Sequence, residues 1–268
     1  MPLYQVIVLS IVQGITELLP VSSSGHLFLT SWLLGWKDEG LAFDIALHLG
    51  TLAAVVVYFF RDWVRTIATG LRLEPAPPGE RDLLWKLAAA SLPIGILGLK
   101  FKDLAETSLR SPWVIGVMLI GVGVLMWIGE NVGRRAKSLA QVSWLDAILI
   151  GCGQALAIVP GTSRSGITMT TALFRDLDRA TAARFSFLLS TPAVAAAGAK
   201  AVYDAVKESG VDSLLTRDLY LGIAISGVTG FLVIAFLMSY LQRSSLKPFI
   251  YYRIAFGILV IALAIVRA

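Results

Sequence analysis

Residues 160–168 read Pro-Gly-Thr-Ser-Arg-Ser-Gly-Ile-Thr and place Arg164 among hydroxyl side chains, in a glycine-rich turn that opens a helix. The N-terminus of a helix offers free N–H groups and a positive dipole end, so it binds anions. Arg164 can hold a phosphate through two parallel hydrogen bonds, and Ser163, Ser165 and Thr168 can donate to its other oxygens. Helix capping would explain one hydroxyl but not an arginine within an apolar segment, so the pattern favours a phosphate site.

Glu17 is the only acidic residue before Asp38, and it lies in a strongly apolar stretch. An ionisable side chain at such a place costs about 2.5–3.5 kcal/mol on membrane-insertion scales, which makes it a candidate for function. Gln13 lies one helical turn earlier and presents its amide to the same point. Carboxylate and amide oxygens suit a hard divalent cation, Mg²⁺ or Ca²⁺, although Gln13 could equally make a hydrogen bond between packed helices.

A Ser-Ser-Ser-Gly-His run ends at His26. A serine activated by a nearby base can attack phosphorus, and histidine can do so itself, so Ser23 and His26 are both candidate nucleophiles. We expect Ser24 to bind phosphate oxygens together with the second cluster. The alternative for His26 is a structural histidine that bonds backbone carbonyls in a tight turn. For His48 the structural role, within its own helix and beside Asp44, is the favoured interpretation.

The two polar clusters occupy matching positions in a chain that repeats itself. Residues 13–26 and 154–166 each contain an apolar segment that ends at a proline, then a run of Ser, Thr and Gly, then apolar sequence again. The repeat predicts a broken helix in each half of the chain. Interrupted segments at matching places in two halves are the best sequence indication of a binding site in a membrane protein.

The composition is that of an integral membrane protein. The 268 residues are 56% hydrophobic and 15% charged, whereas soluble domains are about a quarter charged. The net charge of +5 is assigned to basic loops rather than to nucleic-acid binding. We predict an all-α integral membrane protein, with residues 1–268 in a single membrane domain, because about 20 apolar residues cross a bilayer. The six predicted transmembrane helices are residues 42–60, 83–100, 111–129, 183–200, 219–241 and 249–266.

Two further pairs of apolar segments are too short to cross a bilayer. They surround the polar clusters and comprise residues 1–19 with 25–35, and residues 144–159 with 167–174. Broken backbone at membrane depth persists only when it is buried in protein or lines a wet cavity, so each pair predicts a re-entrant helical hairpin. Three spans separate the hairpins, and an odd number makes them enter from opposite faces. The halves, about 1–129 and 144–266, are therefore expected to be inverted-topology repeats.

Loop charges predict an orientation. Lysine and arginine are more frequent at one set of helix ends than at the other, which predicts that this set is cytoplasmic and that both termini lie outside. The basic ends are residues 61–82, 130–143, 175–182 and 242–248. The first of these, which is rich in proline, is interpreted as a solvated connector.

Cys152 is the only cysteine, so no intrachain disulfide can form.

At these residues the chain resembles the bacterial undecaprenyl-pyrophosphate phosphatase family, which is also known for bacitracin resistance. The resemblance rests on a Glu/Gln-x-x-x-Glu box, here Gln13 and Glu17, and on Pro-Gly-x-Ser-Arg-Ser-x-x-Thr, here residues 160–168. Residues 20–26 and 185–192 also look like the family, so the likeness covers nearly the whole chain. Many members carry two glutamates in the box. Glutamine is within the pattern but leaves Glu17 as the main protein ligand of a metal.

The resemblance implies an enzyme of the bacterial inner (cytoplasmic) membrane that removes the terminal phosphate of undecaprenyl pyrophosphate. It also implies that a divalent cation assists and that the reaction recycles the lipid carrier for cell-wall synthesis. We expect the diphosphate to lie where the two breaks meet, with Arg164 and the hydroxyls on its oxygens, Glu17 and Gln13 on the ion, and Ser23 or His26 attacking.

A transporter that flips a polyprenyl phosphate lipid is the alternative, because inverted repeats with broken helices are also transporter architecture. Membrane lipids surround the protein in either case. The sequence leaves the oligomeric state open, a homodimer included.

Overall fold

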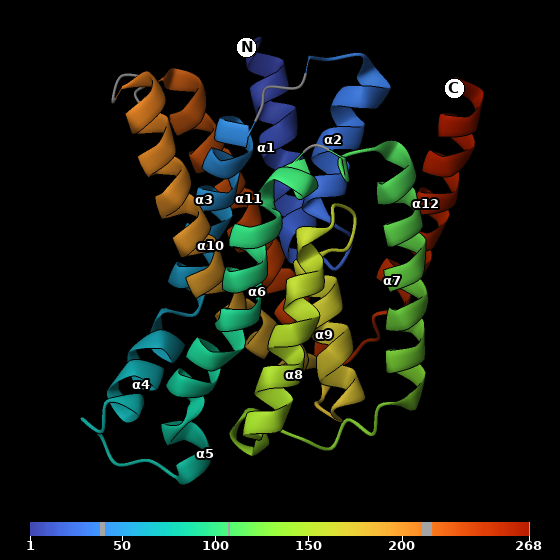
Figure 1. The fold of residues 1–268 in the computed structure, drawn as a ribbon. Helices are drawn as coiled ribbons and strands as arrows, with labels where there is room; N and C mark the ends of the chain where they lie inside the picture. The colour runs from blue at the N-terminus through green and yellow to red at the C-terminus, as the bar shows by residue number, and fades with distance from the viewer. Residues whose placement is uncertain (38–40, 107, 211–215, 268) are drawn as a thin grey trace.

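The computed structural model describes residues 1–37, 41–106, 108–210 and 216–267 (Figure 1). Within these residues the regular structure is helical, and the single β-bridge, between Lys137 and Leu177, is isolated. The predicted all-α fold is therefore confirmed.

Five helices in the described part of the chain are long and apolar enough to cross a membrane. They are α6 (Leu83–Glu106), α7 (Pro112–Val132), α10 (Arg179–Ser209), α11 (Arg217–Leu241) and α12 (Lys247–Arg267). Each coincides with a predicted span, so the chain is a multi-pass membrane protein. The prediction for α10 was too short, because the charged residues at both of its ends continue the 31-residue helix beyond its apolar centre.

The remaining predicted span, residues 42–60, corresponds to α3 (Leu41–Tyr58). This helix is followed by α4 (Phe60–Gly70), with a bend of 71° between the two. The interpretation of residues 61–82 as a plain connector is wrong, because the segment holds most of α4 and the short α5 (Pro78–Arg81). The charged residues of α4 end the apolar run of the predicted span, but they alternate with apolar residues as in an amphipathic helix. Its end is fixed to α6, where Trp85 donates to the carbonyl of Gly70 at 3.1 Å.

Two pairs of shorter helices surround the polar clusters, close to their predicted bounds. The first pair is α1 (Leu3–Leu18) and α2 (Ser23–Leu34), and the second is α8 (Trp144–Ala155) and α9 (Arg164–Phe174), with the 3₁₀ turn η2 (Leu156–Ile158) after α8. In Figure 1, α1 and α2 lie in the half that holds both chain termini, and α8 and α9 lie mainly in the other half. The breaks of the two pairs therefore face each other near the middle of the molecule.

Both breaks contain the same local turn. Ser22 has φ 79° and caps α2 by accepting a hydrogen bond from the Gly25 N–H at 3.4 Å. Ser163 has φ 70° and caps α9 by accepting from the Gly166 N–H at 3.1 Å. A left-handed φ at a residue other than glycine costs on the order of 1–3 kcal/mol and persists only where the surroundings hold it. Each helix that follows a break thus begins at a strained serine.

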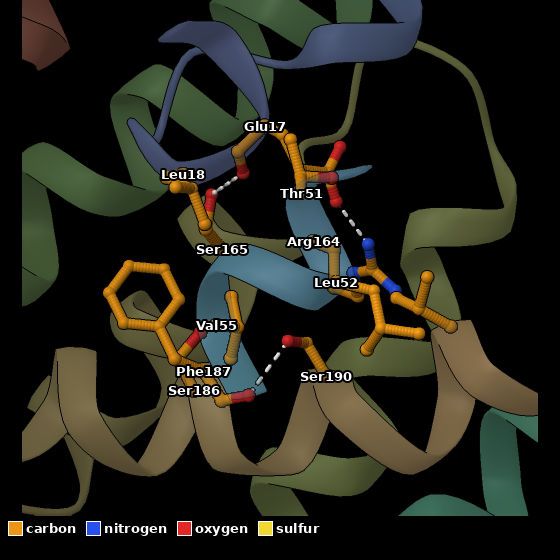
Figure 2. A pocket seen from close by; sticks show the side chains of 11 residues that line it. Glu17, Leu18, Thr51, Leu52, Val55, Arg164, Ser165, Ser186, Phe187 and Ser190 are labelled. Atoms are coloured by element: carbon orange, nitrogen blue, oxygen red, sulfur yellow. Dashed lines mark hydrogen bonds and ion pairs between the residues drawn. The ribbon is translucent and has the colours of Figure 1, made fainter. Parts of the chain in front are cut away.

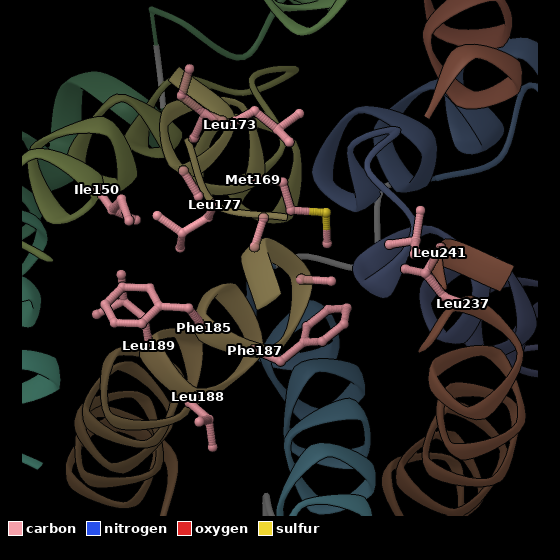
Figure 3. Close-up of a cluster of buried hydrophobic side chains, with 14 of the residues drawn as sticks. Ile150, Met169, Leu173, Leu177, Phe185, Phe187, Leu188, Leu189, Leu237 and Leu241 are labelled. Carbon is pink, nitrogen blue, oxygen red and sulfur yellow. The ribbon is translucent and has the colours of Figure 1, made fainter. Parts of the chain in front are cut away.

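The largest group of buried apolar side chains lies around α9, between α8, α10 and α11 (Figure 3). Its fully buried members include Ile150, Met169, Leu173, Phe185 and Leu237. Because lipid tails are as apolar as these side chains, close packing rather than removal from water holds such helices together. This packing fixes α9, and with it the second polar cluster.

The basic segments 61–82 and 130–143 lie at the end of the molecule opposite both termini (Figure 1). Lys137 and Arg175 meet there on the buried carboxylate of Asp146, at 3.0 and 2.7 Å. These basic segments and the termini thus lie at opposite ends of the molecule, while the side that faces the cytoplasm stays a prediction.

Candidate active site

The two helix breaks are in direct contact. Ser165, in the first turn of α9, donates from its Oγ to the backbone carbonyl oxygens of Glu17 at 3.3 Å and Leu19 at 3.2 Å, at the end of α1. Figure 2 shows Ser165 and Arg164 reaching Glu17 from the same short helix. As the sequence led us to expect, the fold joins the two polar clusters.

The carboxylate of Glu17 is the centre of this junction. Arg164 donates from Nη2 to one carboxylate oxygen, and Ser23 donates from Oγ to the other. Gln13 Nε2 lies 3.3 Å from the second oxygen, so the amide nitrogen of Gln13, rather than its oxygen, faces the carboxylate. Only 10% of the Glu17 side chain and 18% of the Arg164 side chain are exposed. A shielded ion pair is stable only when its other donors and acceptors are bonded as well, and Ser23 and Gln13 provide this for the carboxylate.

A cavity of about 250 Å³ opens beside the ion pair and is lined by both polar and apolar side chains, which are called here its polar wall and its apolar wall. The polar wall includes Glu17, Ser23, Ser24, His48, Ser163 and Arg164. The apolar wall includes Ile45, Leu49, Ile94, Val194 and Ala197, from α3, α6 and α10. The first residues of α2 and α9, Ser23 and Arg164, both lie on the polar wall, so two helix N-termini converge there. An anionic head with an apolar body would match both walls.

His48 belongs to this site, although the sequence analysis favoured a purely structural role. Its Nδ1 lies 2.7 Å from the backbone oxygen of Asp44, which is the intrahelical contact expected. Its Nε2, however, lies 3.3 Å from the carboxylate of Glu17. An ionisable residue within a predicted span was the signal that could have identified it.

His26, in contrast, does not line the cavity. Its Nδ1 is 2.7 Å from the carbonyl oxygen of Ser22, and its Nε2 is 2.8 Å from the hydroxyl of Tyr252. Its ring stacks on Phe256 with 4.7 Å between the centroids. One ring nitrogen is bonded within the turn and the other to Tyr252 on α12, so both are occupied away from the cavity, whereas the Ser23 hydroxyl lies in it.

The predicted phosphate-binding hydroxyls occupy three kinds of position. Ser24 is exposed, and with Ser163 it lines the cavity. Thr168 is fully buried, donates to the carbonyl of Arg164 at 2.7 Å and contacts the hydroxyl of Ser186. Its position supports the first turn of α9 rather than a ligand. Ser165 bonds the backbone of the first break, as described above, and so joins the two breaks.

Arg253 is a third charged residue at the breaks, and the sequence analysis did not identify it. It lies on α12, is fully buried, and donates to the carbonyls of Pro20, in the first break, and Gly161, in the second. An arginine inside the predicted span 249–266 was the signal available for it.

A divalent cation would find Glu17 and Gln13 as ligands here. Gln13 Oε1 is buried without a hydrogen-bond partner, which suits an acceptor held ready for a cation. The described residues contain no group of three or more His, Cys, Asp and Glu side chains that could hold a metal. Mg²⁺ commonly binds through one or two carboxylates, waters and substrate phosphates. The residues therefore fit a cation that is shared with a phosphorylated ligand, rather than one enclosed by protein.

Comparison with known families settles the family of this chain. A family model described as "Bacitracin resistance protein BacA" matches residues 6–259. The chain belongs to this family. It is 47% identical over 264 residues to the undecaprenyl-diphosphatase of Desulforudis audaxviator (strain MP104C), and the match covers 98% of both chains.

Two further relatives show the same extent of similarity. The undecaprenyl-diphosphatase 2 of Stutzerimonas stutzeri (strain A1501) is 46% identical over 274 residues, with 98% of both chains covered. The undecaprenyl-diphosphatase of Gemmatimonas aurantiaca is 47% identical over 266 residues, again with 98% of both chains covered. The match between this chain and the BacA family thus covers both breaks and every helix that lines the cavity.

Proposed function

We propose that this chain is an undecaprenyl-diphosphatase of the bacterial inner membrane, which hydrolyses the lipid diphosphate to undecaprenyl phosphate and inorganic phosphate. The observation that carries the proposal is the hydrogen bond from Ser23 to Glu17 beside Arg164, in a cavity with a polar and an apolar wall. The names of the full-length relatives support the same substrate. The reaction returns the carrier lipid to cell-wall synthesis.

The architecture proposed with this function is a pair of inverted repeats in one membrane domain, about 1–129 and 144–266, each with a re-entrant hairpin. The strained cap at Ser22 and its counterpart at Ser163 support the repeat. The approach of α1–α2 and α8–α9 from different halves of the molecule supports the inversion (Figure 1). Two such hairpins bring two helix N-termini to one point, which favours an anionic ligand.

The terminal phosphate of the substrate lies on the polar wall. Arg164 turns part of its guanidinium from Glu17 to the phosphate oxygens, and Ser163 and Ser24 donate to the oxygens that remain. Glu17 and Gln13 would hold a divalent cation beside this phosphate. When bound, this ion neutralises charge on the diphosphate.

Hydrolysis proceeds through Ser23. Its oxygen forms a bond to the terminal phosphorus while its proton passes to the carboxylate of Glu17. The bond between that phosphorus and the bridging oxygen breaks, and undecaprenyl phosphate leaves with the electron pair. Water then attacks the phosphorus of the phosphoserine, and the bond between that phosphorus and the serine oxygen breaks. The protonated Glu17 carboxyl gives its proton back to the serine oxygen and takes one from the water, so inorganic phosphate leaves and both side chains return to their starting state. A flippase would have no evident use for a serine hydroxyl held on a carboxylate.

The first prediction concerns Ser23. In the purified protein with cation present, Ser23→Ala should lower phosphate release from undecaprenyl diphosphate at least about a thousandfold, because the nucleophile is absent. Ser31→Ala, a change of the same type in α2 away from the cavity, should stay within about twofold. Release by Ser23→Ala above a tenth of the parental rate would contradict this role. If the parent binds the intact lipid but releases no phosphate, the flippase is favoured instead.

The second prediction concerns the cation. Excess EDTA should reduce phosphate release at least about tenfold, and added Mg²⁺ or Ca²⁺ should restore it, because the cation neutralises the diphosphate. Gln13→Leu should raise the cation concentration needed for half-maximal release, since one oxygen ligand is lost. Undiminished release in EDTA would remove the cation from the account.

The third prediction concerns the prenyl chain, which we place against the apolar wall between α6 and α10. Ala197→Trp fills this wall and should lower kcat/KM for undecaprenyl diphosphate about tenfold, while kcat/KM for the much shorter farnesyl diphosphate changes less than about threefold. Ala195→Trp, on the same helix but outside the cavity lining, is the control. An equal loss for both substrates would show that the chain takes another path.

A further inference from the structure

We propose that Arg253 is a positioning residue for the hydrolysis, because one buried guanidinium holds both helix breaks and so fixes Ser23 relative to Arg164. The inference rests on the proposed function. It concerns a residue of α12 that does not line the cavity and is distant in sequence from both polar clusters.

The contacts of Arg253 are made almost wholly with backbone carbonyls. Nη1 donates to Pro20 at 3.1 Å, in the first break. Nη2 donates to Gly161 at 3.2 Å and to Thr162 at 3.0 Å, in the second break. Nε donates to Leu119 at 3.0 Å, in the middle of α7. The planar fork of arginine can serve three such directions together, which the single ammonium group of lysine cannot do.

These carbonyls need a partner because the helices are interrupted. Backbone oxygens released at membrane depth have no water to bond, and each unsatisfied group costs several kcal/mol. The Arg253 side chain is 0% exposed, so it satisfies them from within the protein. Removing it would leave carbonyls of both breaks without their donor at once.

Close packing shows that this region is built around the guanidinium. A Cβ atom at Gly166 would lie 2.7 Å from Arg253 Nη1. Gly161 has φ +90°, and a Cβ there would lie 2.7 Å from the carbonyl oxygen of Ile115. The second break therefore approaches α7 and α12 as closely as it does because two of its residues are glycines.

The residues that Arg253 holds are close in the chain to the two reacting side chains. Pro20 shortly precedes Ser23, and Thr162 shortly precedes Arg164. A side chain that holds Pro20 and Thr162 sets the distance between the nucleophile and the phosphate-binding arginine, although it touches neither. A displacement of about 1 Å in such an arrangement can cost about a hundredfold in rate. No carboxylate among the described residues pairs with Arg253, so its positive charge also adds to the anion-binding potential of the breaks.

The test compares Arg253→Met and Arg253→Lys with Arg267→Met. Arg267 is the matched control, because it lies on the same helix and also donates to a backbone carbonyl, that of Trp32, but on the exposed surface. Phosphate release gives kcat and KM for the folded, monodisperse fraction of each variant. Hydrogen exchange followed by mass spectrometry reports on residues 19–26 and 159–166 separately from the rest of the chain.

Arg253→Met should lower kcat about a hundredfold with KM changed less than about threefold, and Arg253→Lys should recover part of the loss, to about a tenth of the parental kcat. Exchange should become faster in both break segments and remain parental in α11. Arg267→Met should match the parent in every readout. If Arg253→Met does not fold, Arg253→Lys alone decides, through the same reduced kcat and faster exchange at both breaks.

A parental kcat in either folded Arg253 variant would overturn the inference. So would a change confined to KM, or exchange that accelerates equally throughout the chain, since the latter would show general destabilisation. If the parent itself releases no phosphate, the proposed function fails, while the exchange pattern still decides whether Arg253 holds the two breaks together.

Discussion

A helix that breaks inside the protein releases backbone groups that must be bonded there, because a buried N–H or C=O without a partner is costly, and this requirement organises the region around the two breaks. The two breaks meet it partly by using each other. Ser165 of the second break bonds the carbonyls of Glu17 and Leu19 at the first, and Arg253 bonds carbonyls of both. Neither break would be satisfied alone in this way. The strained caps at Ser22 and Ser163 persist because this shared network and the packing around α9 hold them.

The same requirement brings the reactive side chains of the two breaks together. Bonding the breaks to each other brings two helix N-termini together and places Arg164, from the second, on Glu17, from the first. The positive dipole ends and arginines favour an anion, and the carboxylate that balances them receives the hydroxyl of Ser23. The contacts that stabilise the broken backbone and those that would act on a lipid diphosphate are therefore neighbours in one network. A change in one is expected to be felt by the other.

Much of this could be predicted from sequence, since the signals were local. Proline, glycine and serine within apolar segments marked the breaks, and Glu17 and Arg164 stood out as charges in those segments. The positions of His48 and Arg253 could not be derived in the same way, because each reaches the breaks from a helix remote in sequence. The orientation of the His26 ring also could not be predicted, because it depends on a hydrogen bond to a remote residue, Tyr252. The helix at Phe60–Gly70 was missed because its charged residues give it a low mean hydropathy, unlike the apolar runs by which spans were recognised, although it is strongly amphipathic.

The central claim is that one catalytic site is assembled from both breaks, and a double-mutant cycle between them tests it most directly. Phosphate release is measured for the parent, Ser23→Ala, Arg164→Lys and the double variant, with each preparation shown to be folded. Because both residues act on the same terminal phosphate, the account predicts that their effects overlap, with a coupling free energy of about 1 kcal/mol or more. Effects that add to within about 0.3 kcal/mol would mean that the two breaks act independently, and would contradict the account.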